Sequence, residues 1–173
     1  GGNNFKAIAA GNGFSLGLTN EGRIEMWGYA GNGEADLPTG TGYTAIAAGF
    51  GHGLALRSDG SIARWGAQDE GLLDVPDGGG FTAVAAGARH AMALRSDGSI
   101  VAWGRNDEGQ ANAPTGKDFI AISAGWLHSV ALRRTGSIVA WGLNEDGQAA
   151  VPSGSDFIAI SAGGDQSLAI RND

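Results

Sequence analysis

The chain has 173 residues, a formal net charge of −7 and a hydrophobic content of 42%, which is enough for a packed core. This acidic balance argues against a nucleic-acid surface, because displacing phosphate counterions requires clustered Lys and Arg side chains. The absence of Cys excludes disulfides, thiolate metal sites and a cysteine nucleophile. No apolar run approaches the roughly 18 residues of a membrane helix, so we expect neither nucleic acid nor a membrane as a partner.

A repeat of 38 residues organises the chain. It is marked by Trp27, Trp65, Trp103 and Trp141, and the prolines and the Ala-Gly pairs recur with the same spacing. An unbroken period indicates one supersecondary unit that is repeated. We therefore treat residues 1–173 as a single repeat domain, with units 5–42, 43–80, 81–118 and 119–156 and a half unit 157–173.

Each unit opens with an apolar segment. Over Phe119 to Ala124, Phe, Ala and Ser alternate with Ile, Ile and Ala, which predicts a strand buried on both faces. A second strand is predicted over His128 to Arg133, where large residues share one face and small residues share the other. Such a sheet packs well on a copy of itself, because its bulky face can sit on the thin face of its neighbour.

A hairpin and a third strand complete the unit. Asp-Gly follows the second strand at residues 59–60 and 97–98 and is a strong hairpin signal between apolar alternations. A third strand is predicted over Ser137 to Trp141, followed by a connector rich in Gly, Asn, Asp and Pro. Three-stranded antiparallel sheets repeated radially predict an all-β protein, a β-propeller with about five blades, four of them full and one half.

The last unit lacks its third strand. This leaves three possibilities: a five-bladed ring with one thin blade, a fragment of a larger propeller, or a partial ring completed by another chain. An unpaired edge near Leu168 to Arg171 favours homo-oligomer formation through the incomplete last blade.

The segment from Ala85 to Gln110, AAGARHAMALRSDGSIVAWGRNDEGQ, resembles the repeat of the regulator of chromosome condensation family. The resemblance includes the Ala-Gly core, the Asp-Gly turn, the Trp-Gly pair and the Gly-Gln of the connector. The short period and the GQ-x-x-x-P connector are most similar to the bacterial propeller-type β-lactamase inhibitory proteins. This resemblance implies a propeller with three-stranded blades, a protein-binding activity that uses loop aromatics, and a bacterial secreted or periplasmic location. The inhibitory proteins have seven blades, and this chain has fewer repeats.

Strand parity predicts a binding face. The two positions after Ala-Gly and the start of the connector should lie on one face, with the Asp-Gly turns opposite. These positions vary between units, so their side chains are available for a partner, and aromatic and Arg side chains are frequent interface anchors. We predict partner-binding residues Tyr29, Phe50, Arg89, Arg105, Trp126 and Glu145, joined by acidic residues Asp69, Glu70, Asp107, Glu108 and Asp146. The alternative is that these are scattered surface residues without a shared partner.

Catalysis and metal binding are not expected. His52, His90 and His128 occupy one repeat position and invite a metal-site interpretation, but a structural role with each imidazole bonded to a loop carbonyl is favoured. The acidic connectors lack the ligand spacing of a calcium loop. The repeated Trp residues are interpreted as packing elements between blades and not as a sugar platform. No catalytic triad or phosphate loop is found, so we predict no enzyme and no cofactor.

The sequence therefore predicts a non-enzymatic protein-binding propeller, an inhibitor of or scaffold for another protein. The alternative is a carbohydrate-binding or self-assembling propeller module.

Overall fold

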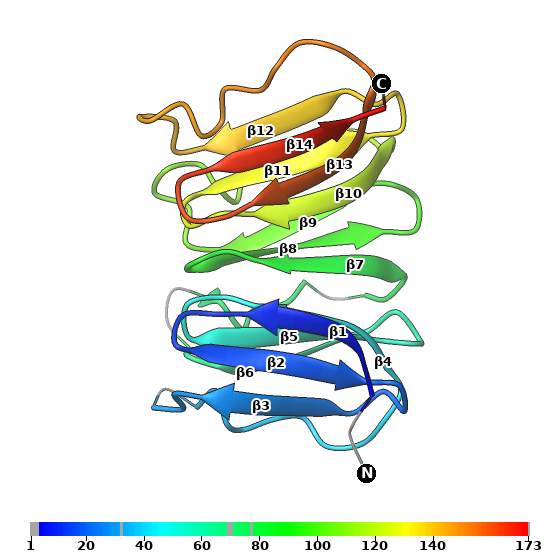
Figure 1. Ribbon diagram of the computed structural model, residues 1–173, viewed down its shortest axis with the longest axis vertical. Coiled ribbons are helices and arrows are strands. Elements are labelled where there is room, and N and C mark those ends of the chain that lie inside the picture. The colour runs from blue at the N-terminus through cyan, green and yellow to red at the C-terminus, as the bar shows by residue number, and fades with distance from the viewer. Residues whose placement is uncertain (1–3, 32, 69–70, 77, 173) are drawn as a thin grey trace.

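The computed structural model describes residues 4–31, 33–68, 71–76 and 78–172, and in these residues every regular element is a β-strand. The strands form five antiparallel sheets, which we number as blades 1 to 5 in chain order (Figure 1). The first strands are β1 (Phe5–Ala10), β4 (Tyr43–Ala48), β7 (Phe81–Ala86), β10 (Phe119–Ala124) and β13 (Phe157–Ala162). The second strands are β2 (Phe14–Thr19), β5 (His52–Arg57), β8 (His90–Arg95), β11 (His128–Arg133) and β14 (Ser167–Arg171). The third strands are β3 (Ile24–Gly28), β6 (Ile62–Gly66), β9 (Ile100–Gly104) and β12 (Ile138–Gly142).

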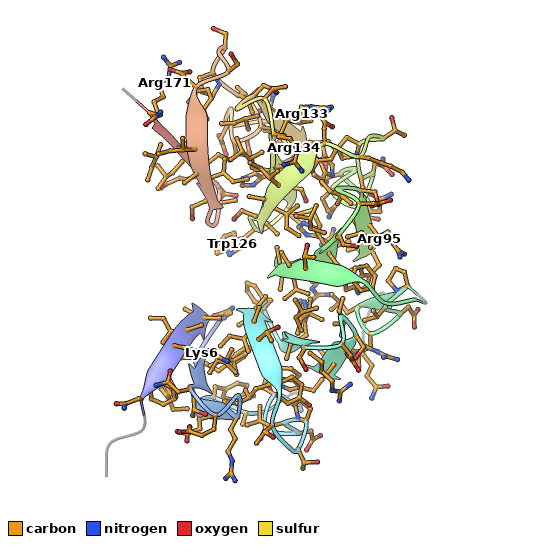
Figure 2. All side chains as sticks on the ribbon, turned by 90° about the vertical axis from the view of Figure 1, so that its right-hand side faces the viewer. Lys6, Arg95, Trp126, Arg133, Arg134 and Arg171 are labelled. Atoms are coloured by element: carbon orange, nitrogen blue, oxygen red, sulfur yellow. The ribbon has the colours of Figure 1, made fainter. Side chains whose placement is uncertain are left out.

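The blades follow one another around an axis, with the first strands innermost. Each first strand contacts the first strand of the next blade, from β1 through β4, β7 and β10 to β13. Figure 2 shows the resulting open arc, with the blade of Lys6 at one end and the blade of Arg171 at the other. The predicted β-propeller with about five blades is confirmed. No helix in the described part of the chain has the length and apolarity needed to cross a membrane.

The first strand departs from simple alternation. A β-bulge shifts its register between Phe119 and Ala121, so that Phe119 and Ile122 both pack toward blade 3. Ile120, at the bulge, is 45% exposed. The predicted faces of this strand and its burial on both sides are therefore wrong at its first residues, because the extra residue changes the phase of the alternation.

The predicted packing of bulky faces on thin faces is confirmed. Leu16 and Leu18 of β2 are fully buried in one cluster with Tyr43, Ala55 and Trp65 of blade 2. Burying a Leu side chain contributes about 1.5–3 kcal/mol, so each blade interface is a substantial part of the core. The Trp residues of the inner blades are packing elements, as predicted.

The two terminal blades carry uncovered faces. On blade 1, Phe5 is 40% and Trp27 is 49% exposed, and their ring centroids lie 6.0 Å apart. On blade 5, Leu168 is 67% exposed, whereas Val130 at the same repeat position is 1% exposed. The difference arises because, among the described residues, no blade follows blade 5 or precedes blade 1.

The Asp-Gly hairpins form as predicted, and the third strand starts one residue later than expected. The carbonyl of Ser137 accepts the backbone N–H of Arg133 at 2.9 Å and so belongs to the turn. In blade 3 the carboxylate of Asp97 accepts the backbone N–H of Ser99 at 3.0 Å and its hydroxyl at 2.6 Å. These bonds lower the pKa of Asp97 and hold the turn closed.

Candidate binding rim

The Ala-Gly loops of successive blades are tied together at one end of the arc. The bonds run from the N–H of Asn12 to Gly49 O (3.1 Å), from Phe50 to Ala88 O (3.2 Å), from Ala88 to Trp126 O (3.2 Å) and from Trp126 to Gly164 O (3.0 Å). We call the surface formed by these loops the rim. Because the loops are held by backbone hydrogen bonds, side chains at these positions are presented in a fixed order around the axis.

The connector starts lie against the same loops. The N–H of Tyr29 donates to Gly13 O at 2.8 Å, and the N–H of Arg105 donates to Arg89 O at 2.7 Å. The Asp-Gly turns instead meet the entry to the next first strand, where the N–H of Phe81 donates to Gly60 O at 3.2 Å. The predicted division into two opposite faces is therefore confirmed.

Phe50 and Trp126 come together on the rim from blades 2 and 4. Their ring centroids are 6.2 Å apart with an interplanar angle of 72°, an edge-to-face contact. The residue between them on the rim is Ala88, whose small side chain leaves room for the contact. Phe50 remains 41% and Trp126 51% exposed, and Figure 2 shows Trp126 on the concave side of the arc.

A hollow of about 310 Å³ opens beside this aromatic pair. All five blades contribute its lining, chiefly through the Ala-Gly ends of their first strands, and Phe50 and Trp126 are its large side chains. Glycine is required there by close approach: a Cβ on Gly49 would overlap the His52 ring beneath it. The site is thus a small-residue floor with two aromatic walls.

The other predicted site residues are spread along the arc. Tyr29 is 61% exposed on the blade 1 connector, and Glu145 is exposed on the blade 4 connector. Arg89 is exposed, while Arg105 is paired with the Asp107 carboxylate at 2.8 Å. In the described part of the chain, no hydrogen bond, ion pair or ring contact joins Tyr29 or Glu145 to the aromatic pair. Of the accompanying acidic residues, Asp69 and Glu70 lie outside the described residues.

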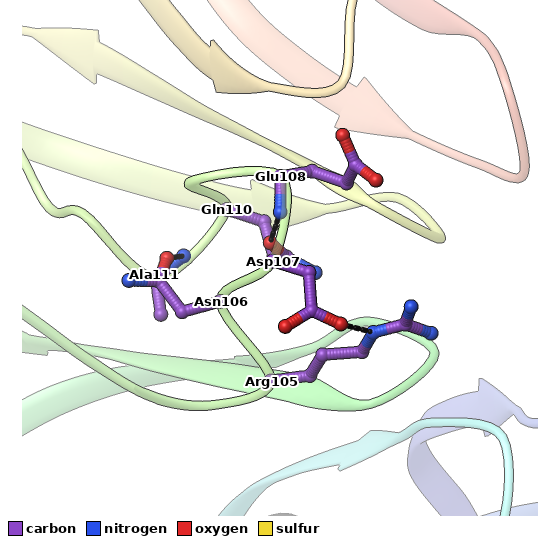
Figure 3. Close-up of polar contacts among 6 residues, drawn as sticks. All are labelled: Arg105, Asn106, Asp107, Glu108, Gln110 and Ala111. Carbon is purple, nitrogen blue, oxygen red and sulfur yellow. Dashed lines mark hydrogen bonds and ion pairs between the residues drawn. The ribbon is translucent and has the colours of Figure 1, made fainter.

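The connector has a structural motif whose role the sequence analysis missed. The buried Gln110 side chain accepts the backbone N–H of Glu108 at 3.0 Å, and Asn106 accepts the N–H of Ala111 at 2.9 Å (Figure 3). Blade 4 repeats both bonds, from Asp146 to Gln148 and from Ala149 to Asn144, each at 2.9 Å. The recurrence of Asn and of Gly-Gln at the same positions of successive connectors was the sequence signal that could have revealed this motif. These polar side chains fix the backbone of the connector.

The histidines connect neighbouring blades. The Nε2 atom of His90 lies 2.8 Å from the Ser129 hydroxyl, and that of His128 lies 2.9 Å from the Ser167 hydroxyl. The structural role was expected, but the predicted partner, a loop carbonyl, is wrong. The hydroxyl lies on the second strand of the next blade, within hydrogen-bond distance of the ring nitrogen, and therefore takes the bond.

His52 differs because blade 3 has Ala91 where blades 4 and 5 have Ser129 and Ser167. Neither ring nitrogen of His52 has a hydrogen-bond partner among the described residues. Burial lowers the pKa of both His52 and His90 to about 4, so these rings are neutral at pH 7. Within the described residues, no group of three or more His, Asp or Glu side chains is placed to hold a metal ion.

Comparison with known proteins identifies the repeat. Residues 81–110 and 119–148 match the family model of the regulator of chromosome condensation (RCC1) repeat. No curated protein sequence matches the chain significantly. Solved structures share the fold at low sequence identity, and the chain spans only about half to three fifths of their length.

Prp20p from Saccharomyces cerevisiae superposes with a TM-score of 0.83 at 20% identity, covering 100% of this chain and 57% of Prp20p. Human WBSCR16 superposes with a TM-score of 0.82 at 18% identity, covering 98% of this chain and 58% of WBSCR16. The ectodomain of the receptor kinase CR4 from Physcomitrella patens superposes with a TM-score of 0.80 at 20% identity, covering 99% of this chain and 52% of the ectodomain. The chain therefore has the β-propeller fold of these structures, and two of its units are similar to the RCC1 repeat.

Proposed function

We propose that the chain is a non-enzymatic protein-binding propeller that grips a projecting loop of its partner with the rim. The observation that carries this proposal is the exposed edge-to-face pair of Phe50 and Trp126 beside a hollow of about 310 Å³. The Ala and Gly residues that line the hollow are compatible with an apolar side chain of the partner. Such a side chain would be buried against the rings of Phe50 and Trp126.

Physical chemistry favours this surface as an interface centre. Trp is among the most enriched residues at binding hot spots, and one aromatic side chain can bury about 150–250 Å². The backbone bonds between the rim loops hold both rings before a partner arrives, which reduces the entropy lost on association. Arg89 and Arg105 lie on blade 3 loops that are joined by a backbone hydrogen bond, and in this proposal they supply polar contacts to the partner at the edge of the interface.

Similar proteins support a protein-binding role. The structure of Prp20p was described together with its binding to Gsp1p and histones, and a second structure contains yeast RCC1 bound to Kap60. These partners belong to those proteins. For this chain they favour protein recognition as the general class of function.

An inhibitory role toward a secreted enzyme is the sharper form of the proposal. It rests on the resemblance of the connector to the propeller-type β-lactamase inhibitory proteins, and it would place the chain in the bacterial periplasm or outside the cell. Purified serine β-lactamase assayed with increasing amounts of the chain tests it. Saturable inhibition that is lost in Trp126→Ala supports the role, and undiminished hydrolysis contradicts it.

The general proposal is tested by comparing immobilised variants. The wild-type chain, Phe50→Ala/Trp126→Ala and the control Ile120→Ala would be used to capture partners, which are then purified and titrated. Ile120 is 45% exposed at the start of β10, the opposite end of that strand from Trp126. A partner held by the wild type and the control but lost by the double variant supports the rim. Equal capture by all three chains contradicts it.

The carbohydrate alternative is less well supported by the site. A flat sugar face stacks on a coplanar aromatic platform, whereas Phe50 and Trp126 meet at 72°. A glycan array separates the two functions, because glycan binding that depends on Trp126 would favour the module interpretation over a protein partner.

A further inference from the structure

An arginine stacked on an aromatic ring recurs at the end of the blades that carries the Asp-Gly turns. The last residue of the second strand holds its guanidinium over the ring that begins the first strand: Arg57 over Tyr43 at 5.3 Å, Arg95 over Phe81 at 4.7 Å and Arg133 over Phe119 at 4.6 Å from the ring centroid. These rings are buried and therefore give each guanidinium a fixed support. A guanidinium that stacks through its plane keeps the N–H groups at its edge for a second partner.

In blade 4 that second partner is a carboxylate of the same chain. Arg133 Nη1 donates to both carboxylate oxygens of Asp118, at 2.6 and 2.8 Å. These bonds lower the pKa of Asp118, so its carboxylate is charged at neutral pH. Asp118 Oδ1 lies 3.1 Å and Arg133 Nη1 lies 3.6 Å from the position that a Cβ would take on Gly116. The carboxylate thus fills the space beside Gly116 that the guanidinium reaches.

Blade 3 lacks this carboxylate, because Gly80 occupies the repeat position of Asp118. The backbone bond at this position is kept: the N–H of Ser96 donates to Gly80 O at 2.8 Å, as the N–H of Arg134 donates to Asp118 O at 2.7 Å. A Cβ on Gly80 would lie 3.6 Å from the Ser96 hydroxyl oxygen. A hydroxyl donor therefore faces the place from which the Asp118 side chain extends in blade 4.

The space beside the arginine is open in blade 3. Arg95 Nη1 lies 3.5 Å from the Cβ position of Gly78, close to the 3.6 Å between Arg133 and Gly116, so the two guanidiniums reach equivalent places (Figure 2 labels both arginines, on neighbouring blades). Apart from the chain neighbours of Gly78, no other described atom comes within 4 Å of this position. Within the described residues, the Arg95 guanidinium has no carboxylate partner.

The acidic side chain of the same hairpin is engaged elsewhere. The Asp97 carboxylate accepts the N–H and the hydroxyl of Ser99 and pairs with the Lys117 ammonium at 2.9 Å. Among the described groups, the charge of Arg95 is therefore left for a partner from outside the chain.

We infer that Arg95, Ser96, Gly78 and Gly80 form a binding site for a carboxylate, and that its ligand is an Asp or Glu side chain in an exposed segment of a partner protein. The carboxylate would accept the Arg95 N–H and the Ser96 hydroxyl, in the place that the Asp118 carboxylate occupies in blade 4. Charge-assisted hydrogen bonds of this kind are about twice as strong as neutral ones. The stacked guanidinium is already ordered and so loses little freedom on binding. The site lies on the face opposite the rim and does not depend on the proposed function.

The inference is tested with short peptides and the intact chain. The probe is acetyl-Gly-Asp-Gly-amide, titrated at constant pH and ionic strength into the isotope-labelled chain. The NMR signals of the Arg95 side-chain N–H and of the Gly78 and Gly80 backbone N–H groups are followed. A second peptide has Asn in place of Asp, which keeps the shape and removes the charge. We expect saturable shifts of these signals with the Asp peptide, and binding weakened by more than about tenfold with the Asn peptide.

Three variants of the chain identify the place of binding. Arg95→Gln removes the cation, whereas the control Arg133→Gln changes an arginine whose partner is Asp118. We expect Arg95→Gln to abolish binding of the Asp peptide and Arg133→Gln to preserve it. Gly80→Asp keeps Arg95 and supplies a carboxylate within the chain. Its Cβ would meet only the Ser96 hydroxyl, at 3.6 Å, and Asp tolerates the φ of +77° at this position better than most residues. This variant should also lose the peptide.

Three results would overturn the inference. The first is the absence of saturable shifts in the wild-type chain. The second is equal binding of the Asn peptide, or of the Asp peptide by Arg95→Gln or Gly80→Asp, which would place the contact elsewhere. The third is displacement of the Asp peptide by inorganic phosphate at a lower concentration than the peptide itself, which would assign the site to phosphate. None of these measurements involves Phe50 or Trp126, so the proposed function keeps its own test.

Discussion

Phe50 and Trp126 meet edge to face across Ala88, although they belong to blades 2 and 4 and lie two repeat periods apart in sequence. The contact exists because the rim loops are joined by backbone hydrogen bonds and because the intervening residue is small. An aromatic pair that is about half exposed contributes little to folding, so both rings are available for the binding role proposed above.

Two tryptophans should differ sharply in their contribution to stability. Trp103 is 7% exposed and its indole donates to Leu72 O, so Trp103→Ala is expected to cost about 3–5 kcal/mol. Trp126 is 51% exposed, so Trp126→Ala should cost no more than about 1 kcal/mol. Urea unfolding of both variants measures the difference. Equal losses would show that Trp126 serves the fold and not the rim.

Leu54 and Leu168 occupy the same repeat position, and their contributions to stability test whether the face of blade 5 is uncovered in solution. Leu54 is fully buried against the next blade, and Leu54→Ala should cost about 2–5 kcal/mol. Leu168 occupies the same position on blade 5 and is 67% exposed, so Leu168→Ala should change stability by less than about 0.5 kcal/mol. The midpoints of thermal unfolding of the two variants, measured at one protein concentration, show whether the two losses differ. A large loss at Leu168 would mean that its face is covered in solution.

The Ala-Gly glycines should be essential only where another blade follows. A Cβ on Gly87 would overlap the His90 ring and lie 2.5 Å from Gly125 O, so Gly87→Ala should cost about 1–3 kcal/mol through overpacking. A Cβ on Gly163 meets nothing within 4 Å. Gly163→Ala should therefore leave the denaturation midpoint unchanged or raise it slightly, and a destabilisation equal to that of Gly87→Ala would contradict the observed spacing.

Buried His52 predicts a loss of stability in acid. Burial lowers its folded-state pKa from 6.5 to about 4, so between these values the unfolded chain binds the proton more readily and stability falls as pH falls. The full loss, roughly 3 kcal/mol, is reached below the folded pKa. Phe14 occupies the same repeat position in blade 1 and is buried, so His52→Phe should fit and should reduce the pH dependence, leaving the part that His90 contributes. Unfolding curves at pH 7 and pH 4.5 that shift equally in both chains would exclude His52 as the cause.

Much of the fold was predictable because the repeat supplies the same local signals several times. The Asp-Gly turns, the alternation of large and small residues in the second strand and the two strands of the fifth sheet all followed from the sequence. The β-bulge at Ile120 was not predictable. A bulge shifts the alternation of side chains by one residue, and the sequence does not reveal that shift when the residues on both faces are apolar. The Ser partners of His90 and His128 were also missed, since each Ser lies on the next blade and its position depends on how far successive sheets are rotated.

The sequence predicted which face of the propeller carries the candidate site but not which of its side chains contact one another. Strand parity placed Phe50 and Trp126 on the same rim, but their contact depends on the tilt of the loops and on the small Ala88 between them. Tyr29 and Glu145 were grouped with them by the same argument, and the structure keeps them on separate connectors. The partner-binding role of all six residues stays a prediction.

The most direct test of the rim is the affinity of the captured partner for three chains, measured by calorimetry: the wild type, Phe50→Ala/Trp126→Ala and Ile120→Ala. Truncating two central aromatic anchors should weaken binding by about 100-fold or more, while Ile120→Ala leaves it unchanged. Equal affinity of the wild type and the double variant would contradict the account.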